Sequence, residues 1–328
     1  MNKKRFLKLI NNFAKSRILV LGDLMLDRYL WGGVERISPE APVPIVKVER
    51  ESVNLGGAAN VAGGASALGS NVYLLGVVGK DNLAKMLLAN LKENGLTTDG
   101  IIVDPSRPTT VKTRIVAHNQ QVARIDRESV AEIGDTIVEK ILAKIKKMLP
   151  KIDAIIISDY GKGVITFKLL YELIDSANKA GKFIAVDPKE VHFMNYRNVS
   201  IITPNHHEAG FISGKKIVNE ATLFDVGSNL MDLLNLESLL ITRGDKGMTL
   251  FEKNRTITHI PASAQTVYDV TGAGDTVIAT LTVARAAGAT IKEAATLANI
   301  AAGLAVARFG TARISASDLQ EAVQKSSL

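Results

Sequence analysis

Residues 269–276 (Asp-Val-Thr-Gly-Ala-Gly-Asp-Thr) place two glycines and a carboxylate directly before an apolar run of small residues. Small residues at the start of a helix leave its first backbone N–H groups open to an anion such as a phosphate. A carboxylate there, Asp275, suits a general base that deprotonates a hydroxyl beside a phosphoryl group. The alternative is a glycine-rich loop in which Asp275 is an ordinary N-terminal helix residue. A single Gly-x-Gly would favour that alternative, so the rest of the chain has to decide.

The elements that would position this segment alternate between short apolar runs and helical patterns. Apolar runs that end in polar or turn residues are typical of buried parallel strands, and the helical patterns between them have the length that a crossover needs. We therefore expect one α/β domain over residues 1–328, with a doubly wound, mostly parallel sheet flanked by helices. The expected strands are 17–22, 71–76, 154–158, 183–187, 200–203 and 238–242, and the expected helices are 83–94, 135–149, 167–180 and 221–234.

Polar side chains follow several of these expected strands. In a doubly wound sheet, ligands bind at the carboxyl ends of the parallel strands. The chain places Asp23, Asp159, Asp187, Asn205 and Arg243 at such ends. We therefore expect the active site along this edge of the sheet.

Two stretches interrupt the alternation, at about 29–50 and 108–126, and both contain β-like runs. Strands inserted between sheet elements suggest a small β lid, which would exclude water from the active site. A lid face that exposes Trp31, Val43, Ile45 and Val48 would need a partner, so we expect a homodimer through the lids. The alternative is a lid that packs only on its own domain.

Composition narrows the class of protein. The chain has 328 residues, 46% of them hydrophobic, which is enough for a full core. Its net charge of +7 is mostly scattered, which favours small anionic ligands over nucleic acid. The absence of Cys excludes disulfides and thiolate chemistry. No apolar run reaches the roughly 18 residues of a membrane span, and the first residues lack the apolar core of a signal peptide, so we expect a cytoplasmic protein without membrane partners.

Two common nucleotide-binding motifs are missing from the sequence. There is no Gly-x-x-x-x-Gly-Lys-Ser/Thr loop, which excludes a P-loop enzyme. The glycine pair Gly56-Gly57 does not lie between a first strand and its helix, as a dinucleotide-binding fold requires.

Three motifs in order, 56–60 (Gly-Gly-Ala-Ala-Asn), 203–208 (Thr-Pro-Asn-His-His-Glu) and 269–275, resemble the ribokinase-like (PfkB) carbohydrate kinases. The resemblance runs from about Ile18 to about Ser315. Three further stretches are similar to the subgroup that phosphorylates D-glycero-β-D-manno-heptose 7-phosphate. They are 36–44 (Arg-Ile-Ser-Pro-Glu-Ala-Pro-Val-Pro), 120–126 and 158–163 (Ser-Asp-Tyr-Gly-Lys-Gly).

The resemblance implies a ribokinase-like fold, an ATP-dependent sugar kinase and a set of catalytic residues. Asp275 would be the general base, and the N–H groups of Gly272, Ala273 and Gly274 would hold the charge on the transferred phosphoryl group. Asn205 and Glu208 would face Mg²⁺ and its waters. Their alternative is a helix start with an Asn cap and a capping box.

The resemblance also implies a nucleotide site. Thr242 and Gly244 would lie along the nucleotide phosphates, although a plain strand-to-turn connection would give the same sequence. Lys189 would reach the nucleotide from a neighbouring strand end. Asn299 and Ala302 lie among small residues that could admit the adenine ring or could simply allow close helix packing.

On the sugar side, the resemblance implies hydroxyl binding by Asp27, Asp159 and Asn60, and a close backbone approach at Gly56 and Gly57. Asp23 could bind hydroxyls too, or could simply cap its turn. A sugar phosphate also needs a cation at its far end, and Lys162 lies in a glycine-flanked loop suited to that role. The other candidates are lid cations, each of which could equally be a solvated surface residue: Lys112, Arg114 and Arg124.

Members of the family often bind K⁺ beside the anion site, largely through main-chain carbonyls. The residues that match the ion's surroundings, unless they form only ordinary helix and loop structure, are Asp269, Thr271, Arg308, Gly310 and Ser315.

We therefore expect a kinase that transfers the γ-phosphoryl group of ATP to O1 of the heptose 7-phosphate, for ADP-heptose and lipopolysaccharide core synthesis. The alternatives are a kinase of another sugar or sugar phosphate, such as fructose, ribose or a hexose phosphate, and a sugar-binding regulator without turnover. In some bacteria the heptose kinase is fused to a nucleotidyltransferase that contains a His-x-Gly-His stretch. This sequence has no such stretch, so we expect a stand-alone kinase.

Overall fold

The computed structural model describes residues 2–118, 120–263, 267–308, 310 and 312–326. Its centre is a nine-stranded sheet in the order β13-β12-β11-β10-β9-β8-β1-β4-β5. Seven of these strands pair in parallel, and β12 and β13 complete one edge as antiparallel strands. The expected mostly parallel α/β sheet is confirmed. Its strands are β1 (Arg17–Gly22), β4 (Asn71–Val78), β5 (Ile101–Val103), β8 (Ala154–Ser158), β9 (Phe183–Asp187), β10 (Ile201–Ile202), β11 (Ser238–Thr242), β12 (Met248–Glu252) and β13 (Ile257–Ile260).

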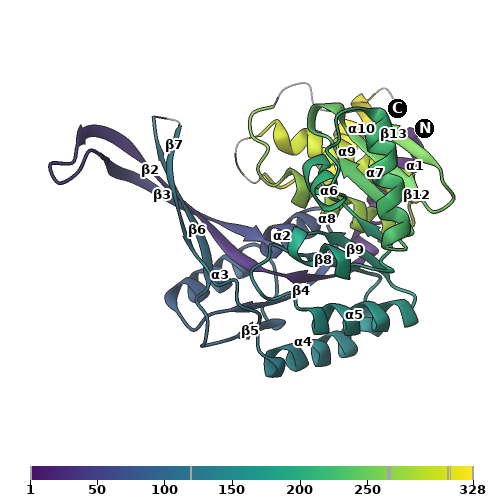
Figure 1. Ribbon diagram of the computed structural model, residues 1–328, viewed down its shortest axis with the longest axis horizontal. Helices are drawn as coiled ribbons and strands as arrows, with labels where there is room; N and C mark the ends of the chain where they lie inside the picture. The colour runs from purple at the N-terminus through teal and green to yellow at the C-terminus, as the bar shows by residue number, and fades with distance from the viewer. Residues whose placement is uncertain (1, 119, 264–266, 309, 311, 327–328) are drawn as a thin grey trace.

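Helices connect these strands and lie on both sides of the sheet (Figure 1). Side-chain caps fix several of their starts: Asp81 accepts from the Ala84 N–H, and Asn219 forms a capping box with Thr222. None of the described helices has both the length and the apolar character needed to cross a bilayer. The helices are α1 (Lys3–Asn11), α2 (Ala58–Ala67), α3 (Asn82–Glu93), α4 (Asp135–Met148), α5 (Phe167–Lys179), α6 (His206–Ile212), α7 (Glu220–Leu233), α8 (Ala273–Ala286), α9 (Ile291–Val306) and α10 (Ala316–Lys325).

The sheet separates two apolar cores. Successive side chains of a strand point to opposite faces, so β1 contributes to both. Ile18 and Val20 pack in the core that α2, α8 and α9 cover. Leu19 and Leu21 pack on the other face, with α4, α5 and α7. The site-bearing helices α2 and α8 are thus held against the sheet by a continuous apolar layer.

A second sheet, in the order β3-β2-β6-β7, stands where the sequence predicts the lid. Its strands are longer than expected: β2 (Leu24–Ile37), β3 (Pro44–Gly57), β6 (Thr110–Ala117) and β7 (Gln120–Arg127). The β2–β3 hairpin projects far from the body of the molecule, and β6 and β7 rise beside it (Figure 1). We call this sheet the lid. Its root lies against the sheet edge where the polar residues gather.

The outer part of the lid exposes apolar side chains, but not the expected set. Val43 and Val48 are about half exposed, at 51% and 50%. Trp31 is instead partly buried: its ring stacks on Tyr29 with centroids 5.7 Å apart, and the Arg50 guanidinium lies 4.9 Å from its centroid. Ile45 is also partly buried. Other exposed apolar side chains of the lid are Ile37, Val122 and Ile125.

Candidate active site

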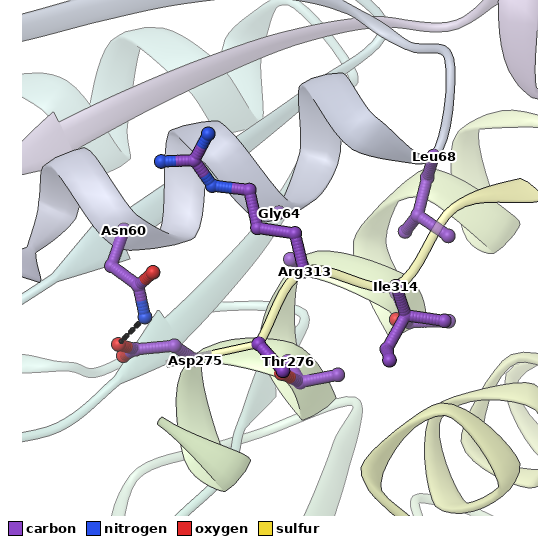
Figure 2. A pocket seen from close by; sticks show the side chains of 10 residues that line it. Asn60, Gly64, Leu68, Asp275, Thr276, Arg313 and Ile314 are labelled. Atoms are coloured by element: carbon purple, nitrogen blue, oxygen red, sulfur yellow. Dashed lines mark hydrogen bonds between the residues drawn. The ribbon is translucent and has the colours of Figure 1, made fainter. Parts of the chain in front are cut away.

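Asp275 lies in the first turn of α8 and is only 7% exposed. Its Oδ2 accepts a hydrogen bond of 2.6 Å from the Asn60 side chain of α2, and its Oδ1 accepts one of 2.7 Å from the Tyr160 hydroxyl. Figure 2 shows Asn60 reaching from α2 to this carboxylate. Burial raises the pKa of Asp275 to about 6, although both hydrogen bonds favour the ionised form. Asp275 is therefore mostly ionised at neutral pH, as a general base must be.

The glycine segment before Asp275 opens α8 as the sequence predicts. Gly272 is the N-cap residue and has a left-handed conformation with φ 77°, which favours glycine. A Cβ at Gly274 would meet no atom within 4 Å, so this part of the turn is open to a ligand. The Ala273 N–H donates to the Val270 carbonyl at 3.2 Å, so this N–H would have to give up that bond to hold a phosphoryl oxygen.

A cavity of about 550 Å³ lies on one side of this turn and brings together most of the expected nucleotide residues. Asn299, which donates to the Pro261 carbonyl at 2.8 Å, and Ala302 form part of its α9 wall. The exposed side chains of Val267 and Val270 give it an apolar rim. The predicted nucleotide and anion residues that line it are Thr242, Gly244, Ala273, Gly274, Asn299 and Ala302.

Asn205 and Glu208 form the capping box that was the alternative to a metal role. The Asn205 Oδ1 accepts from the N–H groups of His207 and Glu208, and the Glu208 Oε2 accepts from the Asn205 N–H at 2.9 Å. Capping uses Oε2 alone, so it leaves Oε1 for another role. The two roles of Glu208 are therefore compatible.

The carboxylates of Asp187, Asp275 and Glu208 lie close enough for the charges of Asp275 and Glu208 to act on Asp187, and Lys189 acts on Asp187 as well. Burial raises the pKa of Asp187 well above its usual range, and the neighbouring charges of Asp275 and Glu208 raise it further, while Lys189 lowers it. A divalent cation fits such a set of oxygens. No three acidic or imidazole side chains in the described ranges converge closely enough to hold a metal directly. These residues therefore fit Mg²⁺ that is bound through water and substrate phosphates.

At the root of the lid, Asp27 and the two glycines expected to bind sugar lie together. The Asp27 Oδ1 accepts from the Arg114 guanidinium, and Asp27 is 6% exposed. A Cβ on Gly56 would lie 2.5 Å from the Asp27 Oδ2, and one on Gly57 would lie 2.4 Å from the Asp23 carbonyl oxygen. Glycine at 56 therefore leaves room for the Asp27 carboxylate.

Asp23 and Asp159, two of the residues predicted to bind sugar hydroxyls, have internal hydrogen-bond partners. Both are almost fully buried, at 1% and 3% exposed. Asp23 accepts from the N–H groups of Tyr160, Lys162 and Val164. Asp159 accepts from the Gly161 N–H and from the side chains of His192 and Tyr196. Their carboxylates hold the loop after β8, and their contact with a sugar stays a prediction.

Besides Arg114, three of the candidate cations lie near the lid root. Lys112 of β6 lies with its Nζ 5.4 Å from the centre of the Tyr160 ring. Burial lowers the pKa of Lys112, and the charges of Lys162 and Arg124 lower it further, which places all three in one electrostatic neighbourhood. The Lys162 Nζ pairs with Glu128 at 2.6 Å, and Arg124 pairs with Asp126 at 3.0 Å.

The residues matched to a K⁺ site are only partly brought together. The Asp269 carboxylate accepts from the N–H groups of Thr271 and Gly310. The Arg308 side chain instead pairs with Asp318 at 2.7 Å, and Ser315 caps α10. The Asp269 carboxylate therefore ties Thr271 and Gly310 together through their N–H groups, whereas the side chains of Arg308 and Ser315 contact α10.

Comparison with known proteins identifies the family. A profile of the pfkB family carbohydrate kinases matches residues 15–318. The chain belongs to the pfkB family of carbohydrate kinases. Members of this family are phosphotransferases that act on sugar hydroxyl groups.

Curated relatives match almost the whole chain. It is 44% identical over 315 residues to the bifunctional protein HldE of Desulfatibacillum aliphaticivorans. This match covers 96% of this chain and 64% of that protein. It is also 44% identical over 319 residues to the bifunctional protein HldE of Geobacter sulfurreducens, covering 97% of this chain and 65% of that protein. The pfkB chain thus spans less than two thirds of the length of these relatives.

Solved structures show that the fold is ribokinase-like. The ribokinase of Arabidopsis thaliana complexed with ribose and ATP superposes with a TM-score of 0.76 at 19% identity, over 95% of this chain and 99% of that one. Phosphofructokinase-2 from Escherichia coli, in complex with substrates and products, superposes with a TM-score of 0.77 at 16% identity. The match covers 94% of this chain and 98% of that one. At these identities the likeness concerns the fold of this pfkB member and not its substrate.

Sequence reasoning missed two contributors to the site. Tyr160 lies within the quoted 158–163 motif, yet its contact with Asp275 joins residues 115 positions apart. Arg107, which donates to the Ser129 and Lys162 carbonyls, follows no recognised pattern. The only available signal was the position of Tyr160, two residues beyond the end of β8, where functional groups of such sheets gather.

Proposed function

We propose that this chain is a Mg²⁺-dependent kinase that transfers the γ-phosphoryl group of ATP to O1 of D-glycero-β-D-manno-heptose 7-phosphate. One observation carries the proposal: a buried, ionisable Asp275 lies between the nucleotide cavity, lined by Ala273 and Gly274, and the lid root, where Asp27 lies. A base in that position can deprotonate a sugar hydroxyl that faces a bound triphosphate.

The proposed reaction uses the chain's own residues as follows. Asp275 accepts the proton of the sugar hydroxyl, and the freed electron pair of that oxygen forms the new bond to the γ-phosphorus. The bond from the γ-phosphorus to the β–γ bridging oxygen breaks, and ADP leaves with that electron pair. The Gly274 end of α8 faces the transferred group and stabilises its charge. Mg²⁺, when bound, would neutralise phosphate charge, and Asp187, Glu208 and Asn205 are the residues that would hold its waters.

The sugar substrate is proposed to carry a phosphate group of its own, because the proposed sugar site is rich in cations. Lys112, Lys162 and Arg124 share one neighbourhood there, and a free sugar would need none of them. The heptose assignment rests on the resemblance of residues 36–44, 120–126 and 158–163 to the heptose 7-phosphate kinases. The two relatives named bifunctional protein HldE support it.

The deciding experiment measures ADP release with ATP and Mg²⁺ across heptose 7-phosphate, fructose 6-phosphate, fructose and ribose. We expect turnover with the heptose phosphate alone. Turnover with another sugar would keep the mechanism and reject the heptose assignment. Absence of ADP release with every sugar, from a protein that still binds ATP, would favour a sugar-binding regulator.

Further parts of the proposal concern ions, assembly and location. We propose a K⁺ site at the loop of Asp269, Thr271 and Gly310, tested by comparing turnover in KCl and in tetramethylammonium chloride.

We propose that the exposed valines of the lid, Val43 and Val48, form a homodimer interface. A cytoplasmic location, with its supply of ATP and sugar phosphates, is part of the same proposal.

A further inference from the structure

The loop after β8, residues 159–164, is held from three directions. Asp23 accepts three of its backbone N–H groups, from Tyr160, Lys162 and Val164, at 2.9–3.1 Å. Asp159 accepts a fourth, from Gly161, at 2.7 Å. The Arg107 guanidinium donates to the Lys162 carbonyl. So many bonds to one short loop fix the path of its backbone, and with it the direction in which its side chains leave.

The side chain that this backbone directs into the site is Tyr160. Its hydroxyl donates to the Asp275 Oδ1 at 2.7 Å, opposite the Asn60 bond to Oδ2. The face of its ring receives the Lys112 ammonium group at 5.4 Å. Burial raises the pKa of Tyr160 well above 10, and the charge of Asp275 raises it further, so the hydroxyl remains a donor throughout the working pH range.

We propose that Tyr160 is a positioning residue, which orients the Asp275 carboxylate for proton abstraction and links it to Lys112 on the sugar side. The proposal deepens the proposed function and rests on Asp275 being the base. Each Asp275 oxygen has one fixed donor, so rotation of the carboxylate is restrained and each oxygen keeps a second lone pair. In this proposal Asp23 and Asp159 support the reaction by holding this loop.

Several charged groups face Asp275 from the elements around it. Asp27 of β2 raises its pKa and Lys112 of β6 lowers it. Asp187, at the end of β9, interacts with Asp275 through charge as well. Tyr160 and Asn60 contribute uncharged donors that favour the carboxylate. Loss of the tyrosine hydroxyl therefore removes a stabilising donor from the ionised base and leaves the charges in place.

The test is Tyr160→Phe, which deletes the hydroxyl and keeps the ring for Lys112. The pKa of Asp275, followed by NMR of ¹³C-labelled aspartate with Asp275→Asn for assignment, should rise by about one unit. The acid limb of kcat/KM should move to higher pH by the same amount, with activity largely recovered at high pH. A loss of kcat/KM that is equal at every pH would show a merely structural role.

The control is Tyr171→Phe, which deletes the hydroxyl of an exposed tyrosine of α5 that stacks on Phe167. It should leave the Asp275 titration where it is. If Tyr160→Phe does not fold, 3-fluorotyrosine placed at 160 keeps the shape and strengthens the donor, and the Asp275 titration should move to lower pH. An Asp275 titration that stays unchanged in the folded 160 variants overturns the proposal. Because the NMR readout needs no substrate, failure of the kinase assignment would be seen separately.

Discussion

Two opposing effects at Asp275 set the chemistry of the site. Burial disfavours the carboxylate, whereas the donors Asn60 and Tyr160 favour it. With the resulting pKa of about 6, Asp275 is ionised at neutral pH and still basic enough to accept a proton. In the free enzyme, protonation of Asp275 removes the base. We therefore expect kcat/KM to fall as the pH drops through about 6.

Asp275→Asn should lower kcat by at least about a hundredfold, because general-base catalysis contributes that much or more. ATP affinity should change little, since the side chain of Asp275 is not part of the nucleotide cavity. Steady-state kinetics and calorimetric titration with ATP measure the two quantities. Asp232→Asn, which removes a surface carboxylate paired with Arg255, controls for loss of charge. Unchanged turnover would remove Asp275 as the base.

Lys162→Ala should raise KM for the phosphorylated sugar about tenfold or more, because a charge-assisted hydrogen bond is lost. KM for the unphosphorylated analogue should hardly change. Lys168→Ala, which removes an exposed lysine of α5, is the matched control. Equal effects of Lys162→Ala on both sugars would show that Lys162 does not contact the distal phosphate.

At the scale of elements, loops are held by buried carboxylates and helices by close contacts with the sheet. The loop after β8 depends on Asp23, and α7 lies so close to β12 that it needs a glycine. A Cβ on Gly227 would lie 2.2 Å from the Phe251 ring. These features determine how precisely the catalytic groups are placed, although none of them contacts a substrate in the proposed mechanism.

Asp23→Asn should destabilise the fold by about 2–4 kcal/mol, because an amide has a single acceptor oxygen and turns an NH₂ group toward backbone donors. Urea denaturation measures the loss. Asp175→Asn removes an exposed partner of Lys179 and should change stability by less than about 0.5 kcal/mol. A similarly small effect of Asp23→Asn would mean that the loop does not depend on this carboxylate.

Gly227→Ala should destabilise the protein even though alanine is the better helix former by about 1 kcal/mol. The new methyl group would overlap the Phe251 ring, and the expected cost is about 1–3 kcal/mol. Gly64→Ala in α2 is the matched control, since its Cβ would meet Ala279 at an ordinary 3.6 Å. Thermal unfolding should show opposite shifts for the two variants. A rise in Tm for Gly227→Ala would show that α7 can move away from β12.

At the scale of the whole molecule, a compact ribokinase-like body carries a long projecting lid (Figure 1). Exposed apolar side chains lie along the outer lid strands, with Ile37 at 60% and Val48 at 50%. Such a surface is costly in water unless it is covered. The proposed second copy would cover it.

Val48→Asp should therefore weaken the proposed homodimer, which light scattering coupled to gel filtration would detect as a shift toward the monomer mass. Val218→Asp, at a 64% exposed position outside the lid, should leave the mass unchanged. A wild-type protein that remains monomeric at every concentration would contradict the lid interface.

Much of this architecture could be predicted from sequence because it follows from local patterns. The apolar runs predicted the bounds of β1, β8, β9 and β11 as the structure has them, and the glycine segment predicted a helix start at Asp275. The pairing of Tyr160 with Asp275 could not be predicted, because it depends on how the sheet brings two distant segments together. The internal role of Asp159 was equally hidden, since its partners His192 and Tyr196 belong to a segment with no recognisable motif.

The root of the lid has a consequence for the timing of the catalytic cycle. Asp27, Gly56 and Arg114 all belong to the lid sheet, so in the proposed mechanism the parts that hold the sugar and the part that shields it from water are one continuous piece. In that mechanism, lifting of the lid would release the sugar and admit water in one movement. Departure of the phosphorylated product and entry of water would then be a single event.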